Sequence, residues 1–188
     1  MTSISLKKIS IIAITAFSLS SASFAGLGLR FAPISAVVGL VDASLDIPLG
    51  SSFRLTPTVI YWNLSLSDSS TSEEFTINTN GAGADFTYHF SGNYNSGLYL
   101  GAYYTSLKLE YESTALNETG ELETSIAGGL LGYQWCWTSF YMNLALKAGT
   151  ASESKITIKN KTTGAETGEE EDAPSTSSGL EFKLGWHF

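Results

Sequence analysis

Few side chains in this sequence are suited to catalysis or metal binding. The histidines are His89 and His187 and the cysteine is Cys136, and no two of them lie close together along the chain. A serine hydrolase needs a base, usually histidine, within hydrogen-bond reach of its nucleophile. A zinc site needs several cysteine or histidine ligands at short spacings. The sequence shows neither pattern, so it predicts a protein that is not an enzyme and holds no metal or cofactor.

The charge balance excludes another class of function. The chain has 10 Lys and Arg against 18 Asp and Glu, a net charge of -8. Nucleic-acid binding needs a basic patch that displaces counterions, so no nucleic acid is expected as a partner. The acidic run at residues 169–172 is expected to form a solvated loop tip. The alternative is an outward-facing site for cations or for a basic partner.

Residues 1–25 have the composition of a signal peptide. Lys7 and Lys8 form a short basic region, residues 9–19 are apolar, and residues 23–25 fit the small-x-small cleavage rule. The apolar stretch is far shorter than the roughly 20 residues that a helix needs to cross a bilayer. We therefore expect export, cleavage after Ala25 and one mature domain over residues 26–188.

The end of the chain has the clearest strand pattern. Residues 179–188 alternate strictly between two faces. One face holds Leu180, Phe182, Leu184, Trp186 and Phe188, and the other holds Glu181, Lys183, Gly185 and His187. A period of two is typical of a strand with one apolar and one polar face.

The rest of the mature chain divides into similar segments. Further strands are expected at residues 26–32, 35–47, 52–66, 74–90, 97–112, 121–135 and 138–151. Short turns alternate with longer polar loops at 67–73, 113–120 and 152–177, with Pro33-Ile34 as the first turn. Short periplasmic turns, long outer loops and an even strand number are typical of bacterial outer-membrane barrels. The sequence thus predicts an all-β, eight-stranded, antiparallel up-and-down transmembrane β-barrel, with a soluble lipocalin-like barrel as the alternative.

For two of the expected strands the sequence pattern does not decide which side chains point outward. The apolar pattern of 52–66 slips by one residue at Trp62, which a β-bulge would explain. In 121–135, Leu122 and Leu130 compete with Leu131 and Tyr133 for the apolar face. The facing of that strand is left open.

The charged residues within the strands are expected to face the lumen. An eight-stranded barrel has an interior just wide enough to be filled by side chains. The expected lumen set is Arg30, Asp42, Asp46, Arg54, Asp85, Lys108, Glu110, Lys147, Glu181 and Lys183. Both signs occur at similar depths, and unpaired charges would be costly in a narrow lumen. We therefore expect a structural plug of ion pairs, the alternative being an ion pathway.

Aromatic residues are expected to form two belts at the membrane surfaces. The periplasmic belt would contain Tyr88, Phe90, Tyr94, Tyr99, Trp135, Trp137, Phe140, Trp186 and Phe188. The outer belt would contain Tyr61, Trp62, Phe75 and Tyr111.

The C-terminal segment resembles the assembly signal of outer-membrane proteins. In that class a terminal Phe preceded by alternating apolar residues is read by the barrel-assembly machinery, and Leu180, Phe182, Leu184, Trp186 and Phe188 match the pattern. With its length and loop rhythm, the whole mature chain resembles the small barrels of outer-membrane proteins X, A and W. Lipid A deacylases of similar size act at the outer rim with a His-x-Ser element. His89-Phe90-Ser91 has this spacing, but both His89 and His187 are expected near the periplasmic rim.

These observations predict a monomeric, non-enzymatic protein of the outer membrane of a Gram-negative bacterium. Its surface loops would support membrane integrity or adhesion. The expected partners are outer-membrane lipid and lipopolysaccharide, the assembly machinery during insertion, and an unidentified extracellular ligand. The alternatives are a narrow pore and a lipid A-modifying enzyme.

Overall fold

The computed structural model describes residues 26–68, 73–91, 96–113, 117–152, 154–172 and 175–188. The expected signal peptide lies outside these ranges. The described elements are β1 (Gly28–Phe31), α2 (Pro33–Val37), β2 (Leu40–Leu49), β3 (Phe53–Asp68), β4 (Glu73–His89), β5 (Gly97–Ser113), β6 (Glu118–Trp137), β7 (Phe140–Ala151), β8 (Ser154–Asn160), β9 (Glu166–Asp172) and β10 (Thr176–His187).

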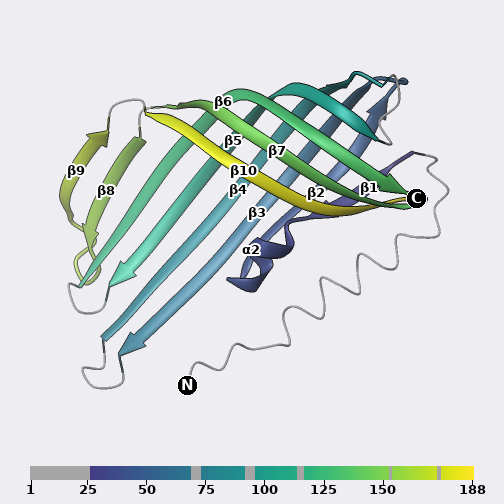
Figure 1. Ribbon diagram of the computed structural model, residues 1–188. Coiled ribbons are helices and arrows are strands. Elements are labelled where there is room, and N and C mark those ends of the chain that lie inside the picture. Colours follow the sequence, from purple (N-terminus) through teal and green to yellow (C-terminus); the bar gives the residue numbers. More distant parts are fainter. Residues whose placement is uncertain (1–25, 69–72, 92–95, 114–116, 153, 173–174) are drawn as a thin grey trace.

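Eight of these strands close into an antiparallel up-and-down barrel (Figure 1). Each of β1 to β6 pairs with the next strand, β7 pairs with β10, and β10 pairs with β1. The closing ladder joins Gly28 to His187 and Phe31 to Leu184. The expected all-β, eight-stranded, antiparallel up-and-down barrel is therefore confirmed. We call the end that carries Gly26 and Phe188 the near end, and the opposite end the far end.

The first strand is shorter than expected, and a helix follows it. The strand expected at 26–32 is β1 with four residues, and the turn expected at Pro33-Ile34 is the start of α2. Proline has a fixed φ and no N–H, which suits the first turn of a helix. Residues 35–37, expected to begin the second strand, belong to α2, and β2 begins at Leu40. No described helix is long and apolar enough to cross a membrane.

The strands are unequal in length, so the wall of the barrel is uneven. β3, β4, β5 and β6 have 16 to 20 residues and extend beyond the others at the far end (Figure 1). The segment 152–177 was expected to be a loop, but it contains the β8–β9 hairpin, and β8 pairs with the far half of β6. The acidic run 169–172 accordingly lies in β9 and not in a loop tip. The structure thus has a four-strand wall that the hairpin widens.

The outward face of the barrel is apolar in a continuous band. Residues that pair across neighbouring strands lie on the same face, and the band can be followed from ladder to ladder around the barrel. It comprises Leu29, Phe31, Val41, Ala43, Leu45, Ile47, Leu49, Phe53, Leu55, Pro57, Val59, Tyr61, Ala82, Ala84, Phe86, Tyr88, Leu98, Leu100, Ala102, Tyr104, Ala127, Gly129, Leu131, Tyr133, Trp135, Phe140, Met142, Leu144, Leu146, Ala148, Leu180, Phe182, Leu184 and Trp186. Many of the large members are exposed, among them Val59, Leu146 and Leu180.

Toward the far end both faces change polarity. Outside, Tyr61 is followed by Asn63 and Tyr104 by Ser106 and Lys108. Inside, the polar side chains of the near half give way to apolar ones, beginning with Ile60 and Leu107. The β3–β4 register is unbroken from Phe53 to Asp68, so the expected bulge at Trp62 is wrong: the strand stays regular while its polarity inverts.

The open question about the sixth strand is settled by burial and pairing. Leu130 is buried inside the barrel, and Leu122 and Ile126 share its face. Leu131 and Tyr133 are exposed on the outward face. Of the expected outer aromatic belt, Tyr61 faces outward, whereas Trp62, Phe75 and Tyr111 lie on the inward face because of the polarity inversion.

Candidate functional site

The near half of the lumen is filled by a chain of charged side chains of alternating sign. In order they are Arg54, Asp46, Arg30, Asp85, Lys147, Glu181, Lys183 and Asp42, and each pairs with the next. Four cations and four anions give this chain no net charge. We call these eight residues the charge chain.

Asp46 is the most heavily bonded member of the charge chain. Its Oδ1 lies 3.0 Å from Arg30 Nε and its Oδ2 lies 3.5 Å from Arg54 Nη1. Thr56 donates a hydrogen bond of 2.7 Å to Oδ1, and Tyr141 donates one to Oδ2. The two arginines and Asp46 have side chains only 1% exposed. This carboxylate therefore neutralises two guanidinium groups away from solvent.

A layer of aromatic and amide side chains closes the near end below the charge chain. Tyr99 donates a hydrogen bond to Asn143 and stacks on His89 at a centroid distance of 5.0 Å. Tyr141 stacks on His187 at 4.2 Å. Arg54 Nη1 donates to Gln134 Oε1 at 2.6 Å, which joins this layer to the charges.

Two inward glycines make room for that layer. A Cβ atom at Gly132 would overlap the ring of Tyr99, and one at Gly185 would overlap the ring of Tyr141. The rings therefore reach across the lumen only because their neighbouring strands carry no side chain at these positions.

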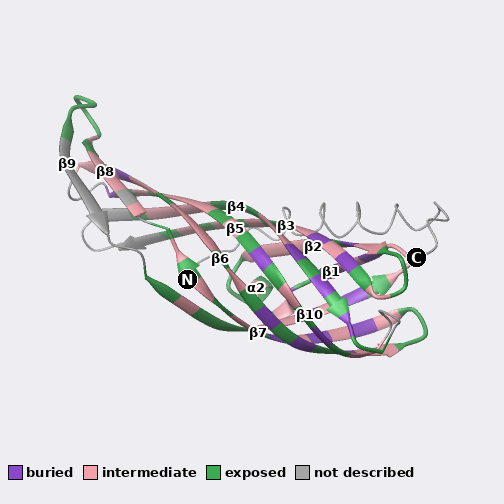
Figure 2. Cartoon of the chain, turned by 90° about the horizontal axis from the view of Figure 1, so that it is seen from above, coloured by how far each residue is buried: buried purple, intermediate pink, exposed green. Residues whose placement is uncertain are grey.

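Solvent reaches the charge chain from the far end. Arg30, Arg54 and Asp46 are 1% exposed, whereas Lys147 is 18% and Glu181 is 16% exposed. Figure 2 shows the same gradient, with the buried stretches gathered in the near part of the barrel. The lumen is therefore closed at the near end and opens toward the far end.

The open part of the lumen is lined by apolar side chains on its long wall. The wall comprises Ile60, Trp62, Ile77, Leu107, Leu109 and Ile126, from β3, β4, β5 and β6. All six are partly buried. We call this space the far chamber: it has an apolar wall, and Lys147, Glu181 and Asp42 form its floor.

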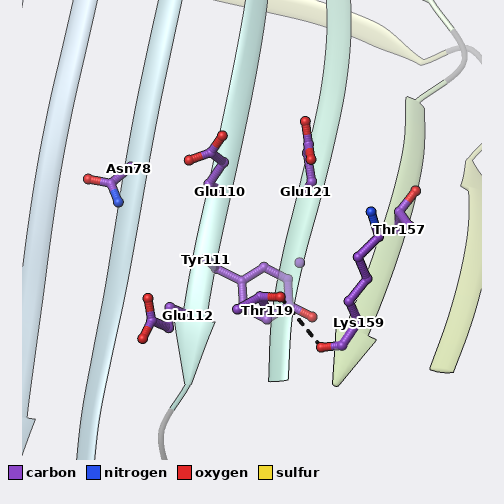
Figure 3. A pocket seen from close by; sticks show the side chains of 9 residues that line it. Asn78, Glu110, Tyr111, Glu112, Thr119, Glu121, Thr157 and Lys159 are labelled. Carbon is purple, nitrogen blue, oxygen red and sulfur yellow. Dashed lines mark hydrogen bonds between the residues drawn. The ribbon is translucent and has the colours of Figure 1, made fainter. Parts of the chain in front are cut away.

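The outward side of the far wall has the opposite character. A shallow hollow of about 230 Å³ there is lined by Asn78, Glu110, Tyr111, Glu112, Thr119, Gly120, Glu121, Thr157 and Lys159 (Figure 3). Beside it, Lys108 donates hydrogen bonds to Glu121 and Glu110, and these bonds raise the pKa of Lys108. The hydrogen bond from Lys108 lowers the pKa of Glu121.

The structure brings together eight of the ten residues expected in the lumen, and they are the charge chain. Lys108 and Glu110 were expected inside but lie on the outward face, 39% and 49% exposed. They lie beyond the polarity inversion, where polar residues face outward, so the expectation for these two residues is wrong. Four residues of the expected assembly signal, Leu180, Phe182, Leu184 and Trp186, lie on the outward face of β10, and Phe188 directly follows that strand.

Sequence reasoning did not identify several lumen residues. Its assignment of Tyr99 to the periplasmic aromatic belt is wrong, because Tyr99 is buried inside the barrel. Tyr99, Tyr141, Gln134 and Asn143 are buried among the charges. Tyrosine and amide side chains also occur on membrane-facing and loop positions, so their type does not reveal their facing. Each of them occupies one of the alternate positions that face the lumen in its strand. That alternation, followed from strand to strand through the pairing with Asp46 and Arg54, would have identified them.

Both histidines lie at the near end of the lumen. His89 is fully buried against Tyr99, and His187 lies against Tyr141. Within the described ranges no group of three or more His, Cys, Asp or Glu is arranged to hold a metal ion. Cys136 is a free thiol beside the β6–β7 turn.

Comparison with known proteins finds a similar fold in a solved structure. No family model matches the sequence, and no curated protein matches it. The crystal structure of CarO from Acinetobacter baumannii is similar over 89% of this chain and 100% of that chain, with 9% identity and a TM-score of 0.42. The assignment to the eight-stranded barrels therefore rests on the strand pairing of this chain itself.

Proposed function

We propose that this protein is an integral, non-enzymatic β-barrel of the bacterial outer membrane, closed to ions, which presents its far end to the outside of the cell. One observation carries the proposal: the outward face of all eight barrel strands forms one apolar band, while the lumen behind it holds the charge chain. A bilayer accepts a sheet only when its backbone groups are all paired, as they are in a closed barrel.

A soluble barrel would have the reverse arrangement. Soluble monomers rarely expose apolar patches larger than a few hundred Å², whereas the band here circles the barrel and leaves Val59, Leu146 and Leu180 more than half exposed. These observations support the membrane reading over a lipocalin-like one.

The same arrangement supports one orientation of the protein in the membrane. The near end has the short turns and the closed lumen, so we place it in the periplasm. The far end carries the long strands and the β8–β9 hairpin, so we place it outside, where it is available for adhesion. Outer-membrane lipid and lipopolysaccharide surround the barrel in this proposal, and the assembly machinery reads the residues around Phe188 during insertion.

Heat modifiability tests the membrane proposal. The mature chain refolded in detergent should run at a different apparent mass before and after boiling, because the closed barrel resists the gel detergent until it is heated. Its circular dichroism should be dominated by strands. Identical migration in both samples, together with good solubility without detergent, would contradict the proposal.

The closed lumen predicts little or no ion conductance. The charge chain leaves no unpaired charge for a permeating ion, and the layer around Tyr99 and Tyr141 fills the near end. Recordings in planar bilayers should show no steady stepwise current after insertion of the purified protein. Large stable conductance would favour the narrow-pore function instead.

A further inference from the structure

We propose that the far chamber holds the acyl chain of an outer-membrane lipid, which enters through a gap in the barrel wall that α2 covers. This inference rests on the membrane location proposed above and adds a ligand to it. It follows from three features: a break in the strand pairing, unfilled space inside that break, and apolar surface that continues from outside to inside.

The break lies between β2 and β10. β1 pairs with β10 from His187 to Leu184 and with β2 from Asp46 to Ala43, and then it ends. Among the described strands, residues 176–183 of β10 pair with β7 alone, and residues 40–42 of β2 pair with β3 alone. Lys183 spans the break with an ion pair of 2.8 Å to Asp42, and α2 covers the part beyond it (Figure 1).

The cover is a weak one. α2 has five residues and none of them is buried, and so short a helix is not stable by its own hydrogen bonds. It is tied to the chamber wall by a hydrogen bond of 2.9 Å from Trp62 Nε1 to Val38 O. Little packing is lost if α2 moves aside. A strand that pairs with a neighbour on each side would lose two sets of backbone hydrogen bonds.

Unfilled space lies behind the break. Gly179 has the parity of Lys183 and Glu181, so its missing side chain would point into the far chamber. A Cβ atom placed on Gly179 would meet no atom within 4 Å. Trp62 also faces inward, from β3.

Apolar surface joins the two sides of the break, and this selects the occupant. Leu180 of β10 and Val41 of β2 belong to the outward band and flank the gap, and α2 exposes Ile34, Val37 and Val38 by 61% or more. A polar solute from the medium would lose its water contacts against such a wall and gain no partner. A lipid acyl chain already lies against this surface and exchanges one apolar environment for another.

Trp62 itself can report the occupant. The four tryptophans are Trp62, Trp135, Trp137 and Trp186. A protein with the last three changed to Phe retains a single fluorophore in the far chamber. It would be refolded into phosphatidylcholine vesicles whose acyl chains carry bromine, which quenches tryptophan on contact, and compared with unbrominated vesicles.

The decisive comparison fills the chamber. Gly179→Phe in the single-Trp62 protein should lose most of the quenching, because its ring takes the place of the acyl chain. Ser178→Phe, one residue away and facing outward, should keep it. If the Gly179→Phe protein does not fold, Gly179→Leu replaces it, because leucine fills less of the space. Heat modifiability checks the folding of each variant.

The outcomes separate this inference from the membrane proposal. Equal quenching in the parent, Gly179→Phe and Ser178→Phe proteins would place the lipid outside the barrel and overturn the inference, as would a parent that is not quenched. A second protein that keeps Trp186 and has the other tryptophans changed to Phe reports the outward band. If Trp186 is quenched and Trp62 is not, the membrane location stands and the acyl-chain site fails. If neither is quenched, the membrane proposal itself fails.

Discussion

Replacing Asp46 with alanine is expected to lower the free energy of unfolding by about 3–5 kcal/mol, the cost of breaking a buried ion pair from one side. The change leaves Arg30 and Arg54 without their nearest carboxylate in a part of the lumen that is 1% exposed. It also removes the acceptor of the hydrogen bonds from Thr56 and Tyr141. Urea titration of the protein in lipid vesicles, followed by tryptophan fluorescence, measures the loss.

Glu123→Ala provides the matched control, because it also removes one carboxylate. The Glu123 side chain is 70% exposed and lies 3.9 Å from Lys108, so the expected change is below about 1 kcal/mol. An Asp46→Ala protein as stable as the Glu123→Ala protein would show that the charge chain does not hold the lumen together.

Changing Phe188 to alanine is expected to affect assembly in cells much more than stability in vitro. The folded barrel would lose at most about 1.5–3 kcal/mol of apolar burial. The backbone bonds at the closure survive the substitution, including the one from Phe188 N to Leu27 O at 2.9 Å. The protein should therefore refold in detergent, but in cells it should accumulate in the periplasm or be degraded. Membrane fractionation with immunoblotting measures the distribution.

Two further variants make the comparison specific. Phe188→Leu keeps an apolar side chain at the end of β10 and should assemble nearly normally. His187→Gln changes the neighbouring inward residue, which lies against Tyr141, and should assemble as well. Normal outer-membrane levels of the Phe188→Ala protein would show that Phe188 is not an assembly signal, while a severe His187→Gln defect would point to the lumen layer instead.

The sequence was sufficient to predict the barrel because one physical rule governs most of it. Within the apolar band every strand presents alternate residues to the outside of the barrel, so a period of two marks strands such as 138–151 and 179–188 clearly. The strand number followed from the even parity that closure demands. Chain closure was therefore predictable without any knowledge of contacts.

The same rule failed where the band ends. Beyond Tyr61 and Tyr104 the outward face is polar, so alternation continues while its meaning reverses. A bulge and such a reversal produce the same slip in the sequence pattern, and this led to the wrong expectations for Trp62, Lys108 and Glu110. Deciding between them needs the β3–β4 register, which is a property of two strands and not of one.

Short local structures were also beyond prediction. Segment 154–172 is rich in Lys, Glu, Thr and Gly, as a loop would be. It forms a hairpin because β7 does not reach residues Glu118 to Glu123 of β6, and β8 pairs with that edge instead. Likewise, α2 forms where β1 ends early, next to a proline. In both cases tertiary context outweighs local preference.

The widened far wall presents two strand edges to its surroundings. Residues 63–68 of β3 pair with β4 alone among the described strands, and β9 pairs with β8 alone. Unpaired edges are templates on which a second chain, for example another copy of the same protein, can add a strand. One of the two edges contains Glu169, Glu170, Glu171 and Asp172. Like charges directly opposite one another destabilise strand pairing, so the acidic residues of β9 disfavour the addition of a second β9 at this edge.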